Sequence, residues 1–132
     1  DTRYYDAGSG RLLSRVRRDA AEPEFVHIVE VNVYENGKLV RDFGSITLPG
    51  APLQPVRAFI NLHHYNGGLH SFRQYDIFGQ VAYESCEGDL GGKRVDISLD
   101  GSDINAASTA TAEYKTCFDG VSKDWARYAN PH

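Results

Sequence analysis

The sequence of 132 residues contains no methionine, one tryptophan and only two cysteines. The missing methionine predicts that the chain follows a removed leader or a trimmed initiator. No apolar run approaches the roughly 20 residues that a helix needs to cross a bilayer, so we expect no membrane span. A chain of this length, with 41% hydrophobic and 24% charged residues, is typical of one globular domain.

The sequence also lacks an excess of basic residues. Its 14 lysines and arginines are outnumbered by 18 aspartates and glutamates, which gives a formal net charge of −4. Binding to nucleic acid requires a clustered basic face. We therefore expect no nucleic acid as a main partner.

Motifs that carry catalysis are missing as well. No nucleophile elbow of the G-x-S-x-G type occurs, and Gly91-Gly92-Lys93 lacks the rest of a phosphate-binding loop. The acidic runs at 87–89 and 100–103 are typical of solvated turns and lack the order of a calcium loop. No two of the 18 acids can be assigned as a glycosidase pair. The sequence thus predicts no catalytic residue and no cofactor, and it favours a protein that is not an enzyme.

From Phe25 onward, apolar residues recur at the period of a β-strand. Asn36-Gly37 is the strongest short hairpin signal, because both central positions of a type I′ turn need a positive φ. We expect a helical turn near Trp125 and strands at 25–34, 39–48, 56–65, 69–78, 80–86, 93–99 and 109–118. Short strands at this spacing predict an all-β fold, an antiparallel β-sandwich of about seven to eight strands.

The N-terminal segment 1–18 differs from this body in charge. It carries five basic and two acidic residues, a net of +3, and the rest of the chain carries −7. Its last four residues, Arg15-Val16-Arg17-Arg18, have the form that secretory convertases of the Kex2/furin type cut after the last arginine. We interpret 1–18 as a removable pro-segment or a flexible arm, and 19–132 as the β-sandwich domain. The alternative is a chance basic cluster in a solvated arm.

Cys86 and Cys117 are an even count, which in an exported protein predicts a disulfide between them. The alternative is two buried free thiols in a cytosolic protein. The convertase motif, the missing methionine and the cysteine pair each favour export. Together they predict a secreted, extracellular protein.

Three histidines lie near one hairpin end, with His63 and His64 before a turn and His70 after it. They are candidates for binding zinc or copper. Adjacent residues of a strand point to opposite faces, so His63 and His64 cannot both face one metal. One of them can approach His70, which gives two ligands at most. Ordinary surface or turn histidines are the alternative.

The organisation of the chain resembles that of the ToxA-like group of secreted fungal effectors. This resemblance is carried by the size, the seven-strand pattern, the Cys86/Cys117 pair and Arg15-Val16-Arg17-Arg18. It implies a processed, non-enzymatic virulence protein that acts on, or is sensed by, a host plant. We expect such a protein to bind a host protein through its surface, in the extracellular space and then inside host cells. The Arg-Gly-Asp tripeptide of the founding toxin is missing here, so integrin-like recognition is not carried over. Eight tyrosines and six phenylalanines also suit protein recognition, although core packing accounts for them equally well.

A second resemblance is local. Arg3-Tyr4-Tyr5-Asp6, three residues, then Gly10-Arg11-Leu12-Leu13-Ser14 is similar to the terminal segment of Rhs/YD-repeat shells, where it is a β-hairpin of the toxin cocoon. The Asp-Pro-x-Gly-Leu boundary of that family is absent, and only about the first fourteen residues agree. This resemblance implies a toxin fragment in which 19–132 is the cargo or an unrelated domain. A third class is a small secreted β-sandwich enzyme or lectin, which predicts a deep pocket with paired acids.

Overall fold

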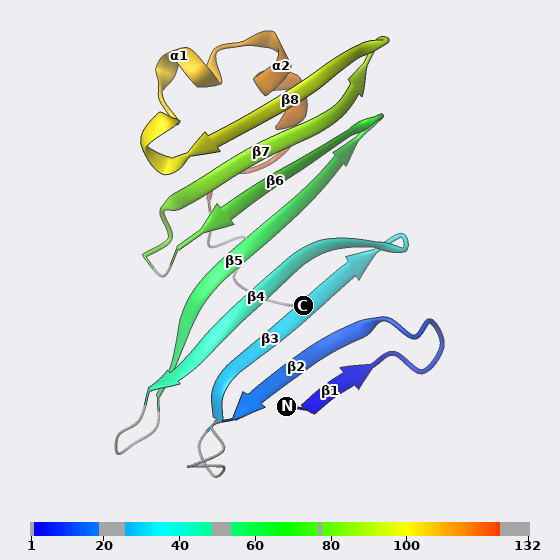
Figure 1. The fold of residues 1–132 in the computed structure, drawn as a ribbon, viewed down its shortest axis with the longest axis vertical. Coiled ribbons are helices and arrows are strands. Elements are labelled where there is room, and N and C mark those ends of the chain that lie inside the picture. The colour runs from blue at the N-terminus through cyan, green and yellow to red at the C-terminus, as the bar shows by residue number, and fades with distance from the viewer. Residues whose placement is uncertain (1, 19–25, 49–53, 77, 125–132) are drawn as a thin grey trace.

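The computed structural model describes residues 2–18, 26–48, 54–76 and 78–124, and its strands form one antiparallel sheet (Figure 1). The strands are β1 (Thr2–Tyr5), β2 (Leu12–Arg18), β3 (Val26–Glu35), β4 (Lys38–Leu48), β5 (Gln54–Asn66), β6 (Leu69–Tyr75), β7 (Val81–Leu90) and β8 (Lys93–Asp100). Each strand pairs with the next along the chain, so their order across the sheet is their order in the sequence. The predicted all-β antiparallel class with about eight strands is confirmed.

The turn between β3 and β4 shows why the local pattern specifies a hairpin. Asn36 and Gly37 have φ angles of 49° and 82°, the left-handed conformation that a type I′ turn requires at both central positions. Beyond this turn, β3 and β4 stay paired as far as Ile28 and Ile46. The predicted hairpin is confirmed.

The chain after β8 covers one face of the sheet. It forms a 3-10 helix, η1 (Gly101–Asp103), and two short helices, α1 (Ala106–Thr109) and α2 (Ala112–Cys117). Side chains of β6 reach the segment that follows, because Arg73 donates to the carbonyl of Ser122 and Tyr75 to that of Lys123. Within the described residues, the second layer of this sandwich-like fold is therefore the C-terminal segment, and we call the face beneath it the covered face.

The prediction of a strand over 109–118 was wrong, because helix α2 occupies most of that range. Its Thr and aromatic content favours a strand, but two caps start helices there instead. Asn105 and Ser108 form a reciprocal capping box, and the Thr111 side chain accepts from the Tyr114 N–H. Spacing of three residues then places Tyr114 and Cys117 on one side of α2, where both are buried.

The covered face holds the core. Alternate residues of β6 are buried there, as the pleat requires. One cluster lies under the helices and consists of Leu69, Cys86, Val95, Tyr114, Cys117 and Phe118. A second cluster lies towards β4 and consists of Phe43, Ile60, Leu62 and Tyr75.

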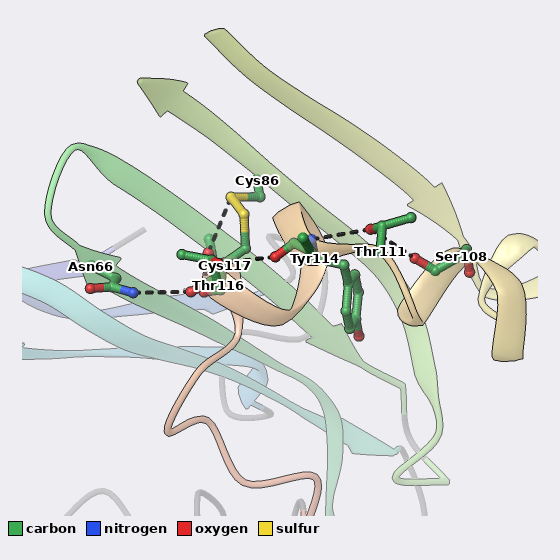
Figure 2. Close-up of a disulfide and its surroundings, with 9 residues drawn as sticks. Asn66, Cys86, Ser108, Thr111, Tyr114, Thr116 and Cys117 are labelled. Carbon is green, nitrogen blue, oxygen red and sulfur yellow. Dashed lines mark hydrogen bonds between the residues drawn. A yellow bond between two sulfur atoms is a disulfide. The ribbon is translucent and has the colours of Figure 1, made fainter. Parts of the chain in front are cut away.

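The Cys86–Cys117 disulfide joins β7 to α2, which confirms the predicted pair (Figure 2). Both cysteines are fully buried. The bond joins β7 to a helix, whereas the sequence pattern predicted a link between two strands. The Ser71 hydroxyl lies 2.6 Å from the Cys117 carbonyl, and Asn66 donates to the carbonyl of Thr116 at 3.0 Å. These side chains of β5 and β6 therefore also attach the backbone of α2 to the sheet.

A buried ion pair adds a polar link between the sheet and α2. Arg73 and Glu84 face each other across β6 and β7 with a nitrogen–oxygen distance of 2.9 Å, and their side chains are 2% and 1% exposed. The Tyr114 hydroxyl lies 2.8 Å from each Glu84 carboxylate oxygen. Burial and this hydrogen bond raise the pKa of Tyr114 to about 12, so the phenol stays a donor at neutral pH.

The first two strands extend the sheet beyond β3. β2 pairs with β1 on one side and with β3 on the other, so the segment 2–18 has its backbone inside the ladder. Arg17 and Arg18 are exposed, and Arg15 lies 3.9 Å from Glu30 of β3. A protease binds its substrate in extended form, so β2 would have to leave β3 before cleavage after Arg18. That cleavage stays a prediction.

Candidate functional site

The second face of the sheet, which we call the open face, carries a chain of polar and aromatic side chains. Strand alternation places Asp42, Asn61, His63, His70 and Gln74 on it, opposite the buried residues of β5 and β6. They come from β4, β5 and β6, and each is half-buried against its neighbours. Cross-strand pairs of this kind can interact directly.

Asp42 accepts hydrogen bonds from two residues of β5. Its Oδ1 accepts from the Asn61 side-chain amide at 2.8 Å, and its Oδ2 lies 3.2 Å from Nε2 of His63. Gln74 of β6 in turn donates to the Asn61 side-chain oxygen at 3.0 Å. Both oxygens of the carboxylate are thus engaged on the open face, and His63 is held in a fixed orientation.

His63 and His70 contact each other directly across β5 and β6. Nδ1 of His63 lies 3.1 Å from Nε2 of His70, which is hydrogen-bonding distance. The His70 ring also stacks on Tyr65, with ring centres 4.7 Å apart and planes 10° apart. Lys38 places its ammonium 4.5 Å from the centre of the Tyr65 ring. The histidine pair therefore sits within an ordered set of side chains.

The structure separates the three histidines as strand alternation predicts. It brings His63 and His70 together, and it places His64 on the covered-face side, opposite Ser71 in the β5–β6 register. Asp42 was missed by the sequence reasoning. Its carboxylate lies 21 residues before His63, and only the β4–β5 register brings the two together.

The environment of His70 disfavours its charged form. Burial lowers the pKa of His70, and positive charge on His63 lowers it further, while Glu87 opposes these effects and Lys38 adds to them. The net result is a pKa below the ordinary 6.5. The folded chain binds this proton less readily than the unfolded chain does. The free energy of unfolding therefore falls as the pH falls below about 6.5.

A recess of about 670 Å³ lies beside the β3–β4 turn. It combines both charge signs with histidine, aromatic and apolar surface, and its lining includes Glu35, Lys38, Arg41, His64, Tyr65 and Val121. Among the described residues that line it, Glu35 is the only acid, whereas an enzyme or lectin pocket predicts a pair. Such a mixed surface suits a polypeptide better than a small apolar ligand.

Within the described residues, no three histidine, cysteine, aspartate or glutamate side chains converge as a metal site would require. None of the helices in this part of the chain is long and apolar enough to span a bilayer. Comparison with protein-family models, with curated proteins and with solved structures found no match.

Proposed function

We propose that this chain is a secreted, non-enzymatic effector that binds a host protein through its surface. The recess beside the β3–β4 turn is the observation that carries this proposal, because it offers charged, aromatic and apolar groups in one hollow. The buried disulfide supports an oxidising compartment, where such bonds persist.

The recess has a rim that suits an acidic segment of a partner. Lys38 is exposed at its edge and lies over the Tyr65 ring, so its ammonium is held at a defined position. Glu35, at the other side of the Asn36-Gly37 turn, would discriminate against a partner with acidic groups in the wrong register.

A charge reversal tests this proposal. We expect Lys38→Glu to weaken binding to the host protein about tenfold or more, because it replaces an attraction by a repulsion at the recess. Lys115→Glu is the matched control, since Lys115 is an exposed lysine of α2 outside the recess. Binding is measured with a photo-crosslinker placed at residue 40, which lines the recess, and host-cell protein as the probe. Equal crosslinking by both variants, with unchanged circular dichroism, would refute the recess as the binding site.

A second candidate is a β-shell fragment of the YD-repeat type, and a specific observation favours it. The Tyr5-Asp6 turn is closed by the Asp6 N–H donating to the Arg11 carbonyl at 2.8 Å and by the Gly10 N–H donating to the Asp6 carbonyl at 2.9 Å. The Asp6 carboxylate also accepts from the Ser9 N–H at 2.8 Å. The Ser9 hydroxyl, which donates to the same carboxylate at 2.7 Å, and the Ser9 N–H lower the pKa of Asp6.

The turn after Tyr75 has the same design. The Asp76 N–H donates to the Gln80 carbonyl, the Gly79 N–H donates to the Asp76 carbonyl, and the Asp76 carboxylate accepts from the Phe78 N–H. Gly10 and Gly79 both have φ angles above 70°, in the left-handed region. The repeat is hidden in the sequence because three residues separate aspartate from glycine in the first turn and two in the second.

Limited digestion with a Kex2-type convertase separates the two candidates. A processed effector is expected to give a single cut after Arg18 and to leave a folded body with both cysteines oxidised, seen by intact mass under non-reducing conditions. A YD-type hairpin is expected to resist, because β2 is held between β1 and β3. Unfolded protein is the positive control for cleavage of Arg15-Val16-Arg17-Arg18.

A further inference from the structure

Asp42, His63 and His70 form one continuous line of hydrogen bonds from β4 through β5 to β6. The two imidazole planes are only 22° apart, and their centres are 5.4 Å apart. The distance between the ring centres is 2.3 Å longer than the 3.1 Å contact between the two nitrogens. This difference matches the sum of the two distances from ring centre to ring nitrogen, so the centres and the nitrogens lie on one line and the rings meet end to end. The facing nitrogens therefore point at each other.

This end-to-end contact holds a proton more readily than a metal ion. Zinc is bound tetrahedrally, so two imidazole nitrogens that ligate it converge on a point off the line that joins them. The facing nitrogens of His63 and His70 are 3.1 Å apart, the length of one N–H···N hydrogen bond. A metal would have to turn both rings out of this end-to-end arrangement.

The contacts also assign the protons of the neutral pair. An ionised Asp42 can only accept, so Nε2 of His63 carries the hydrogen that it donates. Nδ1 of a neutral His63 is then an acceptor, and Nε2 of His70 donates to it. Both Nδ1 atoms are then unprotonated, and Nδ1 of His70 is the one that accepts from neither Asp42 nor His63.

We propose that Asp42, His63 and His70 form a proton relay that takes up one proton with all its contacts kept and breaks its His63–His70 contact on taking up a second. The first proton binds Nδ1 of His70 while the hydrogen on Nε2 of His70 passes to Nδ1 of His63. The imidazolium then lies beside the Asp42 carboxylate. A second proton puts hydrogens on both facing nitrogens, and two donors 3.1 Å apart repel.

Groups on every neighbouring strand act on the relay. Lys38 of β4 and Tyr65 of β5 lie on one side of His70, Phe72 of β6 packs against His63, and Glu87 of β7 is opposite His70 in the register. Glu87 favours the charged form of His70, whereas burial and positive charge on His63 and Lys38 disfavour it. The second protonation is therefore the costly step, and it is the step that separates His63 of β5 from His70 of β6.

Imidazole nitrogen NMR shifts of the intact chain, recorded from pH 8 to pH 4, test the relay. At pH 8 we expect His63 and His70 both to carry hydrogen on Nε2. Replacing His63 by Gln is expected to raise the pKa of His70, because it removes a neighbouring positive charge. His64→Gln, on the other side of the same strand, is expected to leave the His70 titration unchanged.

Two results would overturn the relay. One is a hydrogen on Nδ1 of His63 at pH 8, since that nitrogen could not then accept from His70. The other is a His70 titration that is the same in the native chain and in His63→Gln. Asp42→Asn is the second variant should His63→Gln fail to fold. It is expected to disturb the His63 tautomer, and an undisturbed tautomer would contradict the proposed order of donors.

Discussion

Replacing Cys86 and Cys117 by alanine is expected to lower the free energy of unfolding by roughly 4 kcal/mol, the chain-entropy value for a loop of this length. The two cysteines are 31 residues apart in the sequence and fully buried. In a domain of this size such a loss corresponds to a decrease in Tm of roughly 10–20 °C. Thermal unfolding followed by circular dichroism measures the effect.

Removal of the disulfide is expected to destabilise α2 before the rest of the domain. Without the bond, α2 remains attached through the contacts of Asn66 and Ser71 with the backbone of 116 and 117, and through Tyr114. We therefore expect amides of α2 to exchange faster with solvent before the sheet unfolds. The exposed Ser102→Ala is the control for an ordinary substitution. An unchanged Tm after cysteine replacement or full reduction would contradict a stabilising role for the bond.

Glu84→Gln is expected to lower the free energy of unfolding by about 3–5 kcal/mol, because it leaves the Arg73 guanidinium buried without its anion. The side chains of Arg73 and Glu84 are 2% and 1% exposed, so water cannot replace the lost partner. The Tyr114 hydroxyl loses its carboxylate acceptor in the same step. Urea unfolding at neutral pH measures the change.

A double-mutant cycle with Arg73→Met measures the interaction energy between Arg73 and Glu84, apart from the contacts that each makes with other residues. We expect the double variant to be more stable than the sum of the two single losses predicts, because no charge is then left uncompensated. The exposed pair between Lys93 and Glu113 is the matched control, and Glu113→Gln is expected to leave Tm nearly unchanged. Strict additivity of the two buried substitutions would show that Arg73 and Glu84 do not depend on each other.

Local rules predicted the features that depend on one or two neighbouring residues. The Asn36-Gly37 turn follows from its need for positive φ, and the separation of His63 from His64 follows from strand alternation. The helix at 112–117 was missed because β propensity describes packing on a sheet, whereas the caps of Asn105 and Thr111 act on the backbone.

Features that depend on register could not be read from the sequence. Asp42 meets His63 only because β4 and β5 pair with one particular alignment. Arg73 and Glu84 occupy positions where alternation predicts apolar residues, and each is tolerated there only because the other lies opposite. The disulfide pair could be predicted from the count of cysteines, but its joining of a strand to a helix could not.

The pairing of every strand with its neighbour in the chain gives this sheet a nearly one-dimensional mechanics. In the described residues, opening a hairpin at one end breaks only the ladder next to it, as in a stack of repeats where each unit contacts its neighbours. The Cys86–Cys117 disulfide and the Arg73–Glu84 ion pair both lie towards the β6–β8 end of the sheet. Unfolding can therefore begin at β1 and advance strand by strand. Asp42, His63 and His70 lie on β4, β5 and β6, at the boundary between the strands that unfold first and the strands that the disulfide and the ion pair stabilise.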